Sequence, residues 1–426
     1  MEIVKYPKRS QWDELAKRPE LDVTSLFDTV RSVLDAVKRN GDDAIKAYGE
    51  KFDKVRLDSL QVSDAEIEEA KVFVADDLKA AIIAAHENIR AFHAAQRFET
   101  KKVETTPGVT CWQKAMPIEK VGLYIPGGTA PLFSTVLMLA VPAQIAGCKE
   151  IVLCTPPNKE GKVHPAILFA AAIAGVDKIF KAGGIQAVAA MAYGTESVPK
   201  VDKIFGPGNQ YVTAAKQLVS LKDVAIDMPA GPSEVQVIAD SKANPAFIAA
   251  DFLSQAEHGV DSQAILVTDS EEIIPHVKDA IQTQLEQLPR RQLVERSLEH
   301  SRIILLKDKQ EMIDFTNLYA PEHLIIQTED YMDYADEIEN AGSVFLGAYT
   351  PESAGDYASG TNHTLPTNGY ARAYSGVNLD SFIKKITFQE ITADGIKGLG
   401  ETIRVMATNE ELTAHSNAVT LRLETL

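Results

Sequence analysis

The chain has 426 residues, of which 45% are hydrophobic and 24% are charged, and its formal net charge is −17 at pH 7. This length allows two or three domains, each with a core of its own. A strongly acidic chain is not expected to bind nucleic acid or an anionic membrane, which both require a basic face. No run of 18 apolar residues predicts a membrane span, and the first residues lack the apolar core of a signal peptide. Three cysteines without a CxxC pair argue against a disulfide framework and a cysteine-rich zinc site, so a cytoplasmic location is expected.

Residues 1–100 are predicted to form a helical N-terminal segment. The stretch 10–98 is rich in Ala, Lys, Asp and Glu, with apolar residues at helical spacing. Residues 23–41, VTSLFDTVRSVLDAVKRNG, predict one helix that ends at Gly41, and residues 64–96 predict one or two more.

A first α/β domain is predicted over 101–235. From residue 118, short β-rich runs alternate four times with helical stretches, which is typical of a parallel sheet covered by helices. Glycine-bearing loops follow three of these strands: Pro126–Gly127–Gly128, Gly183–Gly184 and Gly206–Pro207–Gly208. Ligands gather at the carboxyl ends of such strands, and glycine lets backbone N–H groups approach a phosphate. None of the loops matches GxGxxG, so nucleotide binding and tight turns without a ligand both stay open.

A second α/β series follows over 236–375, and a small C-terminal domain over 376–426 carries a helical stretch at its end. The predicted fold is therefore of the α/β class. It has two Rossmann-like parallel-sheet domains without GxGxxG, a helical N-terminal segment and a small C-terminal domain.

The stretch FLSQAEHGVDSQ, residues 252–263, raises the first question of chemistry. Gln255 and His258 stand at i and i+3, so they share one face of a helix that Gly259 would end. This pattern fits the polar end of a helix, and it also fits half of a metal site. Glutamine is an unusual ligand for zinc, which prefers Cys, His, Asp or Glu.

A second candidate is the pair Glu322–His323, which lies between Pro321 and the apolar run LIIQT. Proline favours extended backbone before it, so the pair would sit where a loop enters a strand. A histidine beside a carboxylate can act as a general base near neutral pH, although a surface Glu–His pair fits the same pattern.

A third candidate is the stretch TPESAGDYASGTNHTLPT, residues 350–367, which shows neither a helical nor a strand period. Long irregular stretches inside compact proteins are usually functional or disordered, and we expect function here. Asp356 supplies the hard oxygen that a divalent metal prefers. His258, Asp356 and His363 around a metal-bound water would make a zinc-dependent hydrolase. A non-catalytic two-lobed ligand-binding protein is the other alternative.

Several long strings occur in one order along the chain: VGLYIPGG, FGPGNQYVTAAK, IDMPAGPSEV, DFLSQAEHG, YAPEHL, AGDYASGTNHTLPT and AHSNAVTLRL. From about residue 115 onward the chain thereby resembles the histidinol dehydrogenase family. The resemblance implies NAD-dependent, four-electron oxidation of L-histidinol to L-histidine through L-histidinaldehyde, the last steps of histidine biosynthesis. One departure is Asn368, which stands where glycine is expected after LPT.

The resemblance also implies roles for individual residues. It implies one zinc ion per subunit with four ligands, namely Gln255, His258, Asp356 and His415. It makes His323 the general base and Glu322 the group that activates water, and it gives His363 no role.

Further residues are implied to contact the substrate and the cofactor. The substrate contacts are the zinc ligands together with Ser233, His323 and Glu410. The NAD contacts are Tyr124, Gln186 and Asn209. The family is an intertwined homodimer with shared active sites, so His415 and Glu410 would come from the partner subunit.

Overall fold

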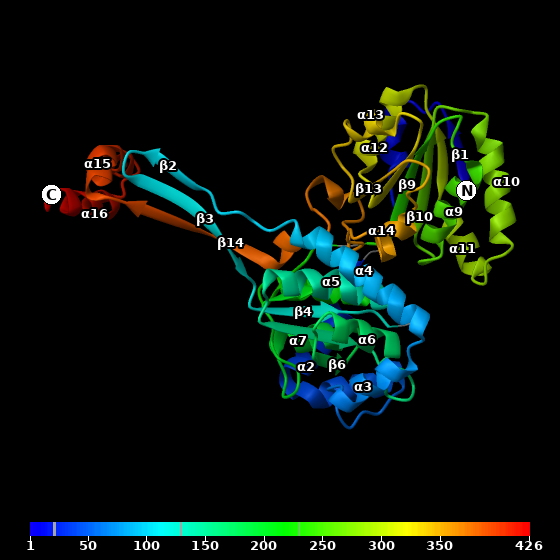
Figure 1. The fold of residues 1–426 in the computed structure, drawn as a ribbon, viewed down its shortest axis with the longest axis horizontal. Helices are drawn as coiled ribbons and strands as arrows, with labels where there is room; N and C mark the ends of the chain where they lie inside the picture. The colour runs from blue at the N-terminus through cyan, green and yellow to red at the C-terminus, as the bar shows by residue number, and fades with distance from the viewer. Residues whose placement is uncertain (20–22, 128–129, 230) are drawn as a thin grey trace.

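The computed structural model describes residues 1–19, 23–127, 130–229 and 231–426, which form two α/β lobes and a long arm (Figure 1). The predicted α/β class with two parallel-sheet domains is confirmed. Among the described helices, none is long and apolar enough to cross a membrane.

The first lobe is built on a parallel five-stranded sheet of order β6-β5-β4-β7-β8. Its strands are β4 (Lys120–Tyr124), β5 (Glu150–Thr155), β6 (Lys178–Lys181), β7 (Lys203–Phe205) and β8 (Ala225–Ile226). One core cluster lies under α3 (Asp64–Phe73), α4 (Asp76–Ala94), α5 (Phe133–Ala146) and α6 (Pro165–Ile173). A second lies under α2 (Phe27–Tyr48), α7 (Gly184–Tyr193) and α8 (Gln210–Ser220). Helices on both faces explain why the strands read as continuous apolar runs.

The second lobe is built on a parallel six-stranded sheet of order β1-β11-β10-β9-β12-β13. Its strands are β1 (Glu2–Lys5), β9 (Glu234–Ala239), β10 (Gln263–Thr268), β11 (Arg302–Leu305), β12 (His323–Gln327) and β13 (Ser343–Leu346). One core cluster involves α9 (Pro245–Ala256), α10 (Ile273–Leu285) and α11 (Arg291–Leu298). Another involves α1 (Trp12–Leu15), α12 (Lys309–Tyr319) and α13 (Tyr331–Ala335).

An arm projects away from both lobes and carries the C-terminus at its far tip (Figure 1). Three antiparallel strands form it in the order β14-β3-β2, namely β2 (Lys102–Thr106), β3 (Val109–Pro117) and β14 (Ile383–Ile391). The helices α15 (Ala393–Asn409) and α16 (Thr413–Leu423) pack on each other at its end. The arm exposes large apolar side chains, among them Val103, Ile386, Phe388, Ile391, Val405, Met406 and Leu421.

The strand pairing differs from the sequence pattern in two places. Residues 1–100 were predicted as helical, but β1 pairs with β11 of the second sheet. Residues 101–117 were assigned to the first α/β domain, but β2 and β3 pair with the C-terminal strand β14. Both pairings join strands that lie far apart in the sequence. The local periodicity of apolar residues cannot predict such pairings. The domain boundaries themselves stay predictions.

The structure also tests predictions about single residues and short stretches. The backbone leaves helical geometry at Gly41, with φ of 52°, but helix resumes beyond it and α2 continues to Tyr48. The prediction that residues 350–367 lack a helical period was wrong, because they include α14 (Glu352–Tyr357). Asn368 has φ of 54°, a left-handed conformation that asparagine tolerates better than most residues in place of glycine.

Candidate active site

The centre of the candidate site is His323, the first residue of β12, whose side chain is buried. Its Nδ1–H donates to the carbonyl of Glu234 at 3.3 Å, and Nδ1 lies 3.6 Å from Oε2 of Glu322. Its Nε2 lies 3.6 Å from Oδ1 of Asp356. The same oxygen of Glu322 accepts the backbone N–H of Glu234 at 2.9 Å. The predicted acid–base pair is therefore buried, and the alternative of a surface pair is wrong.

Helix α14 brings two carboxyl groups to this histidine. Glu352 and Asp356 are four residues apart, so they share one face of the helix. Oε1 of Glu352 lies 3.8 Å from Nδ1 of His323. The Glu352 side chain is fully buried, and neither of its oxygens has a hydrogen-bond partner within the described part of the chain. A buried carboxyl without partners is costly and points to a group that the site receives.

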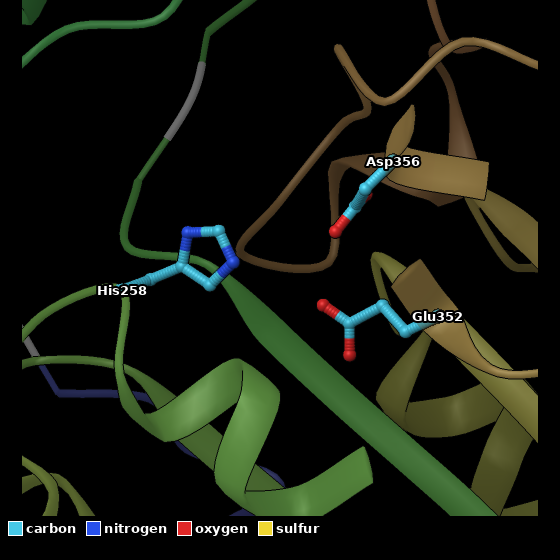
Figure 2. Close-up of side chains that lie close together, drawn as sticks. All are labelled: His258, Glu352 and Asp356. Carbon is cyan, nitrogen blue, oxygen red and sulfur yellow. The ribbon is translucent and has the colours of Figure 1, made fainter. Parts of the chain in front are cut away.

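Gln255 lies in the last turn of α9, which ends at Ala256, and His258 lies two residues beyond that end. The prediction that Gln255 and His258 share one face of a helix is therefore wrong. Gln255 is fully buried, and among the described residues neither atom of its amide has a hydrogen-bond partner. Ligand atoms of His258, Glu352 and Asp356 all lie within 4.8 Å of one another. Figure 2 shows the three side chains directed toward a common space. Nitrogen and carboxylate oxygen converging in this way suit a divalent cation.

The protonation of this cluster follows from burial and mutual charge. Burial lowers the pKa of His323, but the carboxyls of Glu352, Glu322 and Asp356 outweigh it, so the pKa is raised well above its usual value. Burial raises the pKa of Glu352 well above its usual range, with the negative charges of neighbouring acids adding to the effect. Burial also opposes ionisation of Asp356, but the nearby imidazole of His323 lowers its pKa overall.

His363 connects the cluster to the first lobe. Its Nδ1–H donates to the backbone carbonyl of Asp356 at 2.9 Å, which leaves Nε2 to accept the hydroxyl of Thr135 at 3.1 Å. Thr135 lies in the first turn of α5, the helix that follows the first glycine loop. Both ring nitrogens of His363 are therefore occupied. This removes the ligand set of the hydrolase alternative, which needed His363 on the metal.

The glycine loops all follow strands of the first sheet, as predicted: β4, β6 and β7. Gly128 lies outside the described residues. Gly206 has φ of 122°, and a Cβ there would lie 2.1 Å from the carbonyl oxygen of Tyr124, so this position requires glycine. A buried ion pair braces the loop, with Nζ of Lys216 2.5 Å from Asp227 and 2.8 Å from the carbonyl oxygen of Gly206.

The three predicted NAD contacts surround these loops. Tyr124 is buried, and its hydroxyl accepts the N–H of Gly184 at 3.2 Å, which joins the first loop to the second. Gln186 is buried in α7. Asn209 is exposed, and its side chain caps α8 by accepting the N–H groups of Tyr211 and Val212. No further observation tests their contact with a cofactor, so these roles stay predictions.

Three predicted site residues remain: Ser233 lies near the acid–base pair, whereas Glu410 and His415 lie far from it. Ser233 directly precedes Glu234, and its carbonyl accepts the N–H of Gln263. Glu410 ends α15 and His415 lies in α16, and both are exposed at the tip of the arm. Figure 1 shows that tip far from α14. Within one chain, therefore, the fourth predicted ligand does not join the other three.

Sequence reasoning missed two carboxyl groups of this region. The only sequence signal for Glu352 is its position four residues before Asp356. That spacing places the two residues on one face only if the stretch is helical. Asp251 lies one turn before Gln255 in α9, and its carboxylate accepts the side-chain N–H of Gln327 at 2.9 Å. Burial raises the pKa of Asp251 to about 7.

The fold and the site together define a two-lobed α/β enzyme whose acid–base groups lie where the two lobes meet. Comparison with known proteins identifies its family. Residues 16–423 match the family model for histidinol dehydrogenase. Histidinol dehydrogenase of Bacteroides fragilis is 69% identical over 424 residues, which cover 100% of this chain and 99% of the relative. The chloroplastic histidinol dehydrogenase of Arabidopsis thaliana is 53% identical over 418 residues, which cover 97% of this chain and 89% of the relative.

A solved structure agrees with these sequences. The crystal structure of histidinol dehydrogenase from Elizabethkingia anophelis has a TM-score of 0.98 and 56% sequence identity, and the match covers 100% of this chain and 98% of that one. The chain belongs to the histidinol dehydrogenase family, and it is an oxidoreductase.

The raised pKa of Asp251 predicts how its replacement changes stability with pH. Because its folded-state pKa is about 7 and its unfolded value is about 4, its stabilising contribution is complete below pH 4 and is lost as the pH rises to 7. Asp251→Asn has no such dependence. In metal-free protein, the unfolding free energy of the variant relative to wild type should therefore rise by about 2 kcal/mol between pH 5 and pH 8. Urea denaturation at the two pH values measures this, and a constant difference would contradict the assignment.

Proposed function

We propose that this protein oxidises L-histidinol to L-histidine through L-histidinaldehyde, with NAD as the hydride acceptor in both steps. Membership in the family supports the reaction. The main observation behind the proposal is that the candidate acid–base site lies next to the candidate cofactor site. The buried pair Glu322–His323 adjoins the cluster on α14, and His363 links that cluster to the first turn of α5, the helix that follows the first glycine loop.

We propose that zinc is held by Gln255, His258 and Asp356 of one chain and by His415 of the partner subunit. The fit rests on the unpartnered amide of buried Gln255 and on the convergence of nitrogen and carboxylate oxygen near α14. When bound, zinc supplies a template that fixes the substrate's imidazole and amine rather than a water to attack it.

The charge of the ligand set supports a templating role. Two neutral imidazoles, one neutral amide and one carboxylate leave about +1 on a divalent ion. Such a site accepts neutral nitrogen atoms of a substrate without repulsion. Neutral ligands also leave the ion's positive charge available to the acids that surround His323.

His323 is the group that moves the alcohol proton in this proposal. With Nδ1–H committed to the Glu234 carbonyl, Nε2 is the atom that takes a proton from the substrate hydroxyl. A cation on Asp356 would engage the carboxylate that otherwise stabilises the protonated ring, which favours the base form. Glu322 then takes a proton from the water that hydrates the aldehyde, and His323 takes the proton of the hydrate hydroxyl in the second oxidation.

For the cofactor we propose the loops after β4, β6 and β7, with Tyr124, Gln186 and Asn209 as contacts. The support is the position of these glycine-bearing loops at the carboxyl ends of parallel strands, where α/β proteins bind their ligands. NAD supplies the hydride acceptor when bound. The N-terminus of α7, whose N-cap Gly183 provides no side-chain cap, offers backbone N–H groups to its phosphates.

Two subunits would complete each site. His415 and Glu410 lie at the tip of an arm whose apolar side chains are exposed in the single chain. A narrow three-stranded sheet with exposed apolar residues is stabilised by burying that face against another chain. Exchange of identical arms in a twofold dimer would bury the arms and bring each His415 to the partner's cluster. Substrate contacts from Ser233 and from Glu410 of the partner subunit belong to the same proposal.

A cytoplasmic location is also part of the proposal. Its support is the state of the cysteines, since Cys111, Cys148 and Cys154 are all unpaired. Burial raises the pKa of Cys148 and of Cys154 to about 12, which keeps both as thiols. The relative from Arabidopsis thaliana is described as chloroplastic, so location varies among relatives.

The experiment that tests the function is NADH formation when purified protein meets L-histidinol and NAD⁺. We expect two NADH for each histidinol consumed, because each oxidation transfers one hydride. Chelation should abolish the reaction, and zinc added at one equivalent per chain should restore it, with metal content measured in parallel. Absence of NADH from zinc-loaded protein would overturn the proposal, and chelator-resistant activity would overturn its zinc part.

Replacing the acid–base groups should separate the two oxidations. His323→Ala should lower the rate of both by roughly 10²–10⁴. Glu322→Gln keeps an oxygen that accepts the Glu234 N–H but cannot take a proton from water, so it should slow aldehyde oxidation more than alcohol oxidation. Stopped-flow rates with histidinol and with histidinaldehyde measure the two steps, and His276→Ala, an exposed histidine, is the control. Equal loss of both rates in Glu322→Gln would contradict the division of labour.

Mixing two inactive variants tests whether the arm serves the partner's site. His323→Ala and His415→Ala should each be inactive alone. After unfolding and refolding together at equal amounts, half of the dimers are mixed, and each mixed dimer has one site with both histidines. We therefore expect about a quarter of wild-type activity in the mixture. Activity that stays at the level of the separate variants would show that both histidines serve the same chain's site.

A further inference from the structure

Arg18, in the N-terminal segment, forms a buried ion pair behind the candidate site. Its Nε and Nη2 donate to the two carboxylate oxygens of Glu234, each at 2.7 Å. The side chains are 10% and 1% exposed, respectively, so both charges are withdrawn from water. A two-bond contact between a planar guanidinium and a carboxylate fixes the orientation of both groups.

The guanidinium is held on its other sides as well. It stacks on Tyr319, with the guanidinium carbon 3.7 Å from the ring centroid, and Nη2 donates to the Tyr319 carbonyl at 2.6 Å. The Tyr319 hydroxyl donates to Oε1 of Gln263 at 2.8 Å, and Gln263 in turn donates to the Lys17 carbonyl. These contacts form a closed network of buried interactions, which holds Arg18 and Glu234 in a single arrangement.

Glu234 is the residue whose backbone orients the acid–base pair. Its N–H donates to Oε2 of Glu322 at 2.9 Å, and its carbonyl accepts Nδ1–H of His323 at 3.3 Å. It is the first residue of β9, next to β12, in a register that pairs His323 with Val235. One peptide segment thus sets the direction of the Glu322 carboxylate and the tautomer of the His323 ring.

The charge of Glu234 makes this arrangement dependent on its partner. Burial raises the pKa of the Glu234 carboxyl, Arg18 opposes that rise, and the nearby charge of Glu322 adds to it. Removing Arg18 would leave a buried carboxyl with no cation beside it, and such a group moves toward water or takes up a proton. Movement of the carboxylate toward water shifts the backbone that holds Glu322 and His323.

We propose that Arg18 is a positioning residue for the reaction: its ion pair with Glu234 fixes the backbone N–H and carbonyl that orient Glu322 and His323. The inference rests on the proposed function for the identity of the reaction. Arg18 touches neither Glu322 nor His323 through any described hydrogen bond, so its effect passes through Glu234.

The test compares four forms of the zinc-loaded protein: wild type, Arg18→Met, the double variant Arg18→Met with Glu234→Gln, and Arg302→Met. Arg302 is a matched control because its Nη1 also grips the N-terminal segment, at the carbonyls of Leu15 and Lys17, without touching Glu234. We expect Arg18→Met to lower kcat on the order of tenfold or more, with KM for NAD and zinc content unchanged. The double variant should recover most of this loss, since no buried charge is left unpaired and the backbone of residue 234 is the same.

Nitrogen NMR of ring-labelled histidine gives a readout that a purely structural brace would not change and that needs no turnover. In wild type and Arg302→Met, the His323 signals should report the Nδ1–H tautomer, and Arg18→Met should shift them. His323→Gln identifies the signals. If Arg18→Met changes only the melting temperature, or the double variant is no better than the single one, the proposal is overturned. Should Arg18→Met fail to fold, Arg18→Lys, which keeps the charge but loses the two-bond geometry, must show the same tautomer shift and a loss of kcat.

If wild type forms no NADH from histidinol, the proposed function fails by itself. The NMR comparison then still decides whether Arg18 controls the His323 ring.

Discussion

Three acidic side chains surround one buried imidazole, and much of the structure serves to keep them there. Glu322, Glu352 and Asp356 lie within 3.8 Å of the His323 ring nitrogens. Burying several carboxyl groups together is unfavourable unless protons or cations compensate them. The imidazole of His323, which lies among the three acids, provides part of this compensation. Among the described residues, the oxygens of Glu352 and the amide atoms of Gln255 have no hydrogen-bond partner.

The topology brings opposite edges of the two sheets to one place. In the first lobe the glycine loops lie at the carboxyl ends of the strands, as is usual for α/β proteins. In the second lobe His323 and Glu234 begin their strands, so the acid–base groups occupy the amino edge. The bond from His363 to Thr135 joins these edges. A hydride acceptor on the first lobe and a base on the second would therefore meet at one substrate.

The two ends of the chain have opposite roles in the structure. The N-terminal segment completes the second lobe, whereas the C-terminal segment forms an arm that projects away from both lobes. The N-terminal strand β1 extends the second sheet, and Arg18 from the same segment reaches the wall of the site. The C-terminal arm does the reverse, since it carries α15 and α16 away from the lobes (Figure 1), and His415 lies in α16. Its exposed apolar face makes a second chain a structural requirement in our proposal. The stability of the arm and the assembly of the active site would then both depend on the association of two chains.

The sequence alone determined the class of fold, the candidate pair Glu322–His323 and the candidates Gln255, His258 and Asp356. It could do so because alternation of strands with helices, a glutamine three residues before a histidine, and a Glu–His pair at a strand entrance are local patterns. The family resemblance added roles that spacing could not, and it placed His415 with residues far away along the chain.

Only the tertiary structure decided which polar groups lie together and how they are charged. Glu352 gave no clear signal because α14 is six residues long, too short for a helical period to emerge. Arg18, Asp251 and the occupied ring of His363 gained their meaning from burial and from partners distant in sequence. Burial and long-range contact set the pKa of a group and the direction of a side chain, and neither is a property of the neighbouring residues in sequence.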